Sequence, residues 1–162
     1  MPPSPLIDPT TIDCSKVLYA REHIYKILPQ AHEFAQLDGI LHIDAENRTA
    51  IGYRDVKPDE WWCRGHMPGN PIFPGVLMVE TVAQLAAFVM HELLPQNDGS
   101  FLGFGGIDNA KFRGSVIPPA RILIAGRAID ARVRRFICET QAFVDGVMVF
   151  EGVITGMRIK PA

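Results

Sequence analysis

The stretch PGVLMVETVAQLAAFVMHEL, residues 74–93, predicts a long helix that is apolar on almost every side. Such a helix belongs in the interior of a domain, where neighbouring elements cover every face. Glu80 and Gln84 interrupt the apolar run, four residues apart and therefore on the same side of the helix. A carboxylate in such a place is costly unless it is paired, hydrogen-bonded or protonated. The stretch therefore predicts a central helix in which the Glu80 carboxyl is paired, hydrogen-bonded or protonated.

The chain before this helix predicts a short helix, a hairpin and a loop. Residues 15–28 carry apolar side chains at helical spacing and predict an amphipathic helix, with Ser15 as its N-cap. Residues 40–56 alternate apolar and polar side chains and break at residues 46–48, as a hairpin does. Residues 57–73 are rich in proline and glycine and predict irregular structure.

The chain after the central helix predicts strands only. Asp145-Gly146 separates the last two strands and is a two-residue type I′ turn signal. One buried helix and about six antiparallel strands predict an α+β fold in which a curved sheet wraps around the helix. Residues 1–13 are expected to form a disordered or loosely attached tail, and residues 14–162 a single domain. The predicted strands cover residues 101–112, 121–131, 134–144 and 147–159.

Composition and charge narrow the function classes. The formal net charge of −2 gives no support for binding to nucleic acid or to an anionic membrane. Cys14, Cys63 and Cys138 form no CxxC pair, which argues against a disulfide framework or a zinc site and is typical of a reducing cytosol. The first residues lack the basic start and apolar run of a secretory signal. We therefore expect a cytoplasmic protein without a membrane span.

The segment GHMPGNPIFPG, residues 65–75, predicts a stiff loop that leads into the central helix. Its prolines and glycines surround a single histidine, His66, and rigid loops of this kind often place functional side chains. Pro74 is expected at the first helical position, where its missing N–H costs nothing. Gly75 leaves the backbone amide at the helix N-terminus unshielded, so this amide could stabilise a developing oxyanion.

His66, Glu80 and the Gly75 amide together form a set of groups suited to proton abstraction. In this set His66 is the candidate base, Glu80 the candidate acid, and Gln84 is within reach to orient the carboxyl. Taken singly, each feature is more typical of ordinary structure than of catalysis. Together, however, they match the pattern of a known family.

The segment GHMPGNPIFPGVLMVETVAQ, residues 65–84, resembles the signature of the FabZ-type 3-hydroxyacyl-acyl-carrier-protein dehydratases of type II fatty acid synthesis. That signature reads GH-x-P-G-x-P-I-x-P-G-V-L-x-x-E-x-x-A-Q, and each fixed residue is present here at the same spacing. A weaker similarity extends over residues 24–157. The resemblance implies a hot-dog fold, which agrees with the predicted pattern of elements.

The resemblance also implies an activity, namely the dehydration of (3R)-3-hydroxyacyl thioesters to trans-2-enoyl thioesters in fatty acid or related lipid biosynthesis. It assigns the base to His66, the acid to Glu80 and the thioester carbonyl contact to Gly75. The implied partner is acyl carrier protein, which carries the substrate on its phosphopantetheine, and neither a metal nor another cofactor is expected. A homodimer is implied, with each site shared between the two chains, and possible assembly of three dimers.

Two further groups of residues complete the expected site. The acyl chain is expected to lie in an apolar tunnel along the central helix, and the acidic carrier protein is expected to dock on a basic patch. An ordinary solvated strand face is an equally good interpretation of that patch. The tunnel residues are Ile72, Phe73 and Phe104, and the docking residues are Lys111, Arg113 and Arg121.

Several family features are absent and predict a divergent member that serves a specialised lipid pathway. Gln30-Ala31 stands where the family often has His-Arg, and Gly103 stands where many members have a tyrosine thought to gate the tunnel. Pro118-Pro119-Ala120 replaces a Pro-Gly-Asp. The alternatives are a thioesterase-type hot-dog enzyme and a non-catalytic hot-dog protein that binds acyl-CoA or acyl carrier protein.

Overall fold

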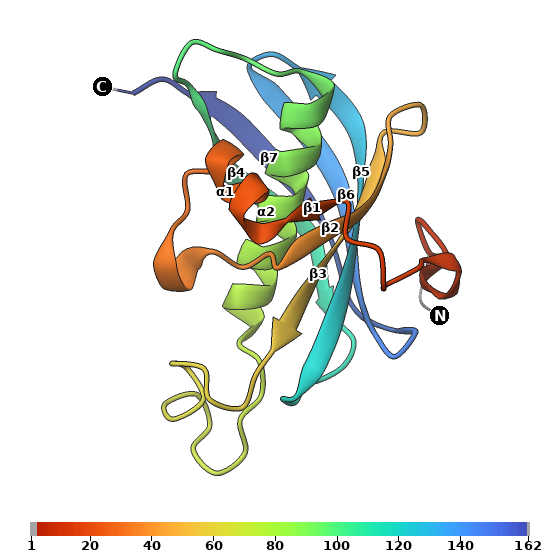
Figure 1. Cartoon of the computed structure of the whole chain (residues 1–162), viewed down its shortest axis with the longest axis vertical. Helices are drawn as coiled ribbons and strands as arrows, with labels where there is room; N and C mark the ends of the chain where they lie inside the picture. Colours follow the sequence, from red (N-terminus) through yellow and green to blue (C-terminus); the bar gives the residue numbers. More distant parts are fainter. Residues whose placement is uncertain (1–2, 162) are drawn as a thin grey trace.

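The long helix α2 (Gly75–Leu93) lies across one face of a single antiparallel sheet (Figure 1). In the computed structural model, which describes residues 3–161, the sheet has seven strands in the order β1-β2-β3-β5-β6-β7-β4. The short helix α1 (Arg21–Ile27) packs against α2 and lies beside strands β1 and β2 of the sheet. The strands are β1 (Tyr19–Ala20), β2 (Gly39–Asp44), β3 (Thr49–Val56), β4 (Phe101–Phe112), β5 (Ala120–Arg132), β6 (Arg135–Val144) and β7 (Val147–Ile159).

The two predicted turns lie where the sequence placed them. Strands β2 and β3 form a hairpin whose turn covers residues 45–48. Strands β6 and β7 are joined by Asp145 and Gly146, with φ of 49° and 78°. Positive φ at both central residues is the requirement of a type I′ turn, whose twist matches the twist of the strands.

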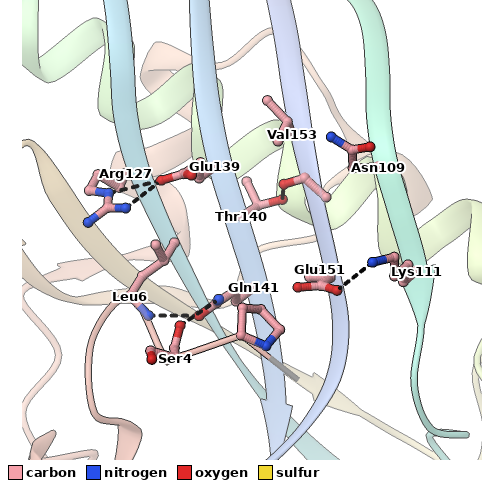
Figure 2. A pocket seen from close by; sticks show the side chains of 12 residues that line it. Ser4, Leu6, Asn109, Lys111, Arg127, Glu139, Thr140, Gln141, Glu151 and Val153 are labelled. Atoms are coloured by element: carbon pink, nitrogen blue, oxygen red, sulfur yellow. Dashed lines mark hydrogen bonds and ion pairs between the residues drawn. The ribbon is translucent and has the colours of Figure 1, made fainter. Parts of the chain in front are cut away.

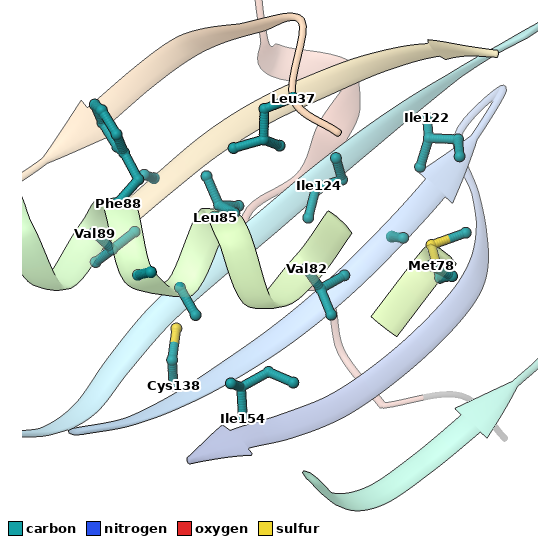
Figure 3. Close-up of a cluster of buried hydrophobic side chains, with 14 of the residues drawn as sticks. Leu37, Met78, Val82, Leu85, Phe88, Val89, Ile122, Ile124, Cys138 and Ile154 are labelled. Atoms are coloured by element: carbon teal, nitrogen blue, oxygen red, sulfur yellow. The ribbon is translucent and has the colours of Figure 1, made fainter. Parts of the chain in front are cut away.

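The core lies between α2 and the sheet (Figure 3). Helix residues Val82, Leu85 and Phe88 are fully buried and pack with Ile124 of β5 and Ile154 of β7. Burying a side chain of this size contributes about 1.5–3 kcal/mol. By length and composition α2 could cross a membrane, but its position in the core accounts for its apolar character.

The opposite face of the sheet carries a smaller apolar cluster that the N-terminal segment covers. Leu41, Ile51 and Phe143 are buried there, and Leu6 and Ile7 pack against them. The expectation of a loosely attached tail over residues 1–13 remains a prediction, and residues 1–2 lie outside the described residues.

Two expected helix starts are wrong. The first helix begins at Arg21 with Ala20 as its N-cap, because the chain at Leu18–Ala20 pairs with β2 instead. The Ser15 hydroxyl donates to Asp13 at 2.6 Å and caps no helix. Pro74 is the N-cap of α2 rather than its first helical residue, with an extended ψ of 130°.

The fold class is confirmed. The structure is an α+β hot-dog fold with one long central helix, although the sheet has seven strands rather than about six. The additional strand is β1, which has only two residues and left no pattern in the sequence. Residues 57–73 contain no helix or strand, as their proline and glycine content predicted.

Candidate active site

The Glu80 carboxyl lies one and a half turns into α2 and is half-buried. The side-chain amide of Gln84 donates to Glu80 Oε1 at 2.7 Å, and that of Gln30 donates to the same oxygen at 3.5 Å. Within the described residues no hydrogen bond reaches Oε2. A protonated Glu80 would therefore carry its proton on Oε2, because Oε1 already accepts two N–H groups.

Gln84 is almost completely buried, and all its hydrogen-bonding groups in the network have partners. Its Oε1 accepts from the Tyr25 hydroxyl at 2.6 Å and from the Gln36 backbone N–H at 3.0 Å. Its Nε2 donates to the Phe34 carbonyl at 2.6 Å and to Glu80. Two donors on one side and two acceptors on the other allow a single orientation of the amide, with an N–H directed at Glu80.

Tyr25 supports this network from α1 and was missed by the sequence reasoning. Its hydroxyl donates to Gln84 and accepts from the Leu37 backbone N–H at 2.7 Å. Burial raises the pKa of Tyr25 to about 12, so the phenol stays neutral and keeps its donor hydrogen. A tyrosine beside the buried Ile24 of an amphipathic helix was a weak signal, because nothing in the sequence pairs it with Gln84.

His66 lies in the loop before α2, and its ring is fixed by one side-chain hydrogen bond. The ring Nδ1 is 2.7 Å from the Ile72 carbonyl oxygen, and the His66 backbone N–H donates to the Trp62 carbonyl at 2.8 Å. A carbonyl can only accept, so Nδ1 carries a proton, and in the neutral ring Nε2 keeps its lone pair. This is the tautomer that a general base acting through Nε2 requires.

The loop that carries His66 is anchored by Trp62. The Trp62 ring is 2% exposed and packs edge-on against Phe73, with ring centres 5.6 Å apart. Its indole N–H donates to Glu60 at 3.0 Å, and Glu60 also pairs with the buried Arg54. The loop is therefore tied to β3 and to the core, although it contains no regular structure.

Gly75 begins α2 and presents its amide beside His66. The N–H groups of Leu77 and Met78 both donate to the Pro74 carbonyl at 3.0 Å, whereas the Gly75 N–H has no acceptor within the described residues. A Cβ at Gly75 would lie 3.0 Å from the Phe112 ring, so a side chain there would require this ring to shift. The free amide at a helix N-terminus is a suitable contact for a carbonyl oxygen that gains negative charge.

The candidate base and the candidate acid line different cavities. His66, Gly75, Ile72 and Phe73 line a cavity of about 270 Å³. Glu80, with Gln84, Gln30, Gly103 and Phe104, lines a second cavity of about 30 Å³. None of the five best-defined cavities within residues 3–161 is lined by both His66 and Glu80. Within one chain, the two halves of the predicted site therefore border separate cavities.

A larger cavity of about 360 Å³ lies on the opposite face of the sheet, under the N-terminal segment (Figure 2). Gln141 binds this segment, because its Oε1 accepts from the Leu6 backbone N–H at 2.8 Å. The charged residues there are paired, with Arg127 bound to Glu139 at 2.6 Å and Lys111 near Glu151 at 3.7 Å. None of the predicted catalytic residues lines this cavity.

The three predicted docking residues are all ion-paired. Lys111 and Arg113 both contact Glu151. Arg121 donates two hydrogen bonds to Asp55, at 2.6 and 2.7 Å, and these bonds hold the pKa of Asp55 below its usual value. Their charges are partly neutralised within the chain, so the electrostatic attraction they offer to a partner is reduced.

Comparisons with known proteins identify the family of this chain. A family model described as a FabA-like domain matches residues 28–153. The chain belongs to this family. Relatives named 3-hydroxyacyl-[acyl-carrier-protein] dehydratase FabZ occur in Moorella thermoacetica, at 35% identity over 80% of this chain and 89% of the relative, and in Rhizobium johnstonii, at 35% identity over 93% and 94%. The chain is thus a divergent FabZ-type member of the FabA-like family.

Solved structures share the fold at low sequence identity. The dehydratase heterocomplex ApeI:P from Xenorhabdus doucetiae has a TM-score of 0.70 at 13% identity, over 85% of this chain and 91% of that chain. A mutant thioesterase from Pseudomonas aeruginosa has a TM-score of 0.59 at 15% identity, over 75% and 80%. These likenesses confirm the hot-dog fold, which enzymes of different activity share.

Proposed function

We propose that this protein dehydrates (3R)-3-hydroxyacyl thioesters carried on acyl carrier protein, with His66 as the base and Glu80 as the acid. The product is the trans-2-enoyl thioester, in fatty acid or related lipid biosynthesis. The observation that carries the proposal is 35% identity to FabZ dehydratases over most of the chain, together with the intact loop and helix around these two residues. Family membership supports the dehydratase class; the roles of the two residues are our inference.

The geometry of each half suits one step of this reaction. The Gly75 N–H binds the thioester carbonyl and makes the α-proton more acidic. Nε2 of His66 removes that proton, and the electron pair of the C–H bond forms the C2=C3 double bond. The C3–O bond breaks with its electrons on oxygen, which takes the proton from Glu80 Oε2 and leaves as water. Each proton transfer is assigned to a side chain of the protein, and we expect no metal or organic cofactor to take part.

The separation of His66 and Glu80 into two cavities supports a site shared by two copies of the chain. Strand β4 is at the edge of the sheet, so one side of its backbone is unpaired with another strand. Phe104 and Phe112 on β4 are more than half exposed, and each borders one of the two cavities. A homodimer that pairs these edges would bury both rings. Assembly into a trimer of dimers remains a prediction.

The carrier protein is acidic and needs exposed positive charge on its partner. Lys111, Arg113 and Arg121 remain the proposed docking residues, although each has an acidic neighbour. Arg134 and Arg135, in and beside the exposed turn between β5 and β6, have no acidic partner within the described residues. Charge reversal at either group, followed by measurement of carrier-protein affinity, identifies the group that takes part in docking.

The test of the proposed function is turnover of 3-hydroxyacyl carrier-protein thioesters, followed as enoyl product. Wild type is expected to be active, and His66→Ala and Glu80→Gln are each expected to lose about 100- to 10,000-fold in kcat. His42→Ala and Glu92→Gln change exposed residues of the same types and serve as controls. Release of free thiol without enoyl product would instead indicate a thioesterase. Absence of both activities on carrier-protein and CoA thioesters of several lengths would indicate an acyl-binding protein.

A further inference from the structure

Gln30 follows α1 and reaches the carboxyl that the proposed mechanism uses as the acid. Its Nε2 donates to Glu80 Oε1 at 3.5 Å, and this contact directs the other end of the amide away from that oxygen. The Gln30 Oε1 atom is buried and has no hydrogen-bond partner within the described residues. A buried acceptor without a partner is unfavourable and is rare in folded proteins, so this one requires an explanation.

The surroundings of Gln30 indicate what kind of group could satisfy it. Gln30 lines the cavity of about 30 Å³ beside Glu80. A space of this size is enough for one water-sized group, which needs about 10–15 Å³. Apart from Glu80 and Gln84, the other side chains around the cavity are apolar, among them Leu102 and Phe136. The cavity therefore suits one oxygen-sized polar group that donates a hydrogen bond.

We propose that the amide oxygen of Gln30 binds the hydrogen of the substrate's 3-hydroxyl group, and then a hydrogen of the water that this group becomes. This inference rests on the proposed function and adds a residue that selects for the hydroxyl group at C3. The hydroxyl oxygen keeps its own hydrogen, which Gln30 Oε1 accepts. It receives a second proton from Glu80 Oε2 and the electron pair of the C3–O bond, and the water leaves bound to Gln30.

The role of Gln30 differs from that of Gln84. Gln84 has two hydrogen bonds on each end of its amide, so it has no free group for a substrate and acts by positioning Glu80. Gln30 has one weak contact to Glu80 and a free acceptor. Two amides contact Glu80 Oε1. That of Gln84 positions the proposed acid, and that of Gln30 binds the leaving group.

The test compares ligands with and without the 3-hydroxyl group in protein that cannot turn them over. His66→Ala removes the base and leaves the contacts around Gln30 and Glu80 in place. In this background, Gln30→Met should weaken binding of the 3-hydroxyacyl carrier-protein thioester about 3- to 10-fold, which corresponds to one hydrogen bond. Binding of the saturated acyl thioester of the same length should stay unchanged. Gln96→Met, at a glutamine outside both cavities, is the control.

The inference is overturned if Gln30→Met weakens both ligands equally or neither. Gln30→Asn gives a second test that keeps the amide but withdraws its oxygen by one methylene group, and it should show the same selective loss. If Gln30→Met does not fold, Gln30→Asn alone decides. Failure of the proposed function is distinguishable from failure of this inference, because it would show as wild-type protein without dehydratase activity.

Discussion

The Glu80 carboxyl and the His66 ring are held by very different amounts of structure. Glu80 lies on a buried helix, and Gln84, Tyr25 and Gln36 form a hydrogen-bonded network that fixes the group facing it. His66 lies in a loop, and its ring has one hydrogen bond, to the Ile72 carbonyl. The proposed acid is thus positioned by side chains, and the proposed base is positioned by the path of the backbone.

This difference predicts which substitutions should impair the surroundings of Glu80 and which should impair those of His66. The network around Glu80 is vulnerable to loss of single side-chain groups, because each leaves a buried partner unsatisfied. The loop around His66 is vulnerable to changes of backbone conformation, because Ile72 must keep its carbonyl in place. We therefore expect substitutions in the network to have larger effects than substitutions in the loop.

Gln84→Leu should have the largest effect. It leaves the Tyr25 hydroxyl, the Gln36 N–H and the Phe34 carbonyl without their partner, which should cost about 3 kcal/mol or more of unfolding free energy. Loss of the amide that orients Glu80 should also lower kcat about 100-fold. Urea unfolding and steady-state turnover measure the two effects.

Thr81→Val is the control for Gln84→Leu. It removes a buried hydroxyl from the same helix, but this hydroxyl donates only to the Leu77 carbonyl, at 2.6 Å, and does not touch Glu80. It should change stability without changing kcat. An equal loss of kcat in both variants would show that the network acts through helix stability and not through the position of the acid.

Tyr25→Phe should have an intermediate effect. It leaves the Leu37 N–H without an acceptor and removes one donor from Gln84, at a cost of about 1–2 kcal/mol. Because burial raises the pKa of Tyr25 to about 12, this group stabilises the fold below the ordinary pKa of 10.0, and the contribution is lost as the pH rises from 10 to 12. Unfolding in urea across this range should show that loss in wild type and a smaller one in Tyr25→Phe.

Tyr19→Phe is the matched control, since the Tyr19 hydroxyl has no hydrogen bond within residues 3–161. It should leave both stability and its dependence on pH unchanged. A steep loss of stability between pH 10 and 12 that persists unaltered in Tyr25→Phe would contradict the account of this network.

Gly69→Ala should have the smallest effect, and we expect this effect to be a lower kcat. Gly69 has a φ of +83°, and a side chain there would touch nothing within 4 Å, so the cost is backbone strain of about 1 kcal/mol. Relief of this strain should shift the His66 loop and lower kcat about threefold. Gly65→Ala, in the same loop and also in open space but without a positive φ, should match wild type. Equal turnover in the two variants would show that the loop tolerates changes of backbone conformation.

The sequence alone predicted the elements whose pattern is local. The apolar period of residues 74–93, the alternation in the strands and the Asp145-Gly146 turn each act over a few residues, and the structure has each of them. The start of α1 was wrong because Leu18–Ala20 is held by pairing with β2, some twenty residues away in the chain. A short segment that pairs with a distant strand leaves no periodic signal of its own.

For the candidate site, too, the sequence predicted only the residues that are close together in the chain. His66, Gly75, Glu80 and Gln84 fall within twenty residues and resemble a known signature, so the sequence brought them together. Tyr25 and Gln30 meet Gln84 and Glu80 across about 50 residues or more of chain, and only the fold places them there. Gln30 was noticed in the sequence as a departure from the family, but its unpaired oxygen is visible only in the structure.

The central claim is that His66 of one chain works with Glu80 of a second copy, and complementation tests it most directly. His66→Ala and Glu80→Gln proteins are unfolded together, refolded as a mixture and assayed for turnover of a 3-hydroxyacyl carrier-protein thioester. Half of randomly formed dimers would contain one chain of each kind, and one of their two sites would be intact, so the account predicts recovery of about one quarter of wild-type activity. A mixture that stays as inactive as the two parents would show that the base and the acid do not come from different chains.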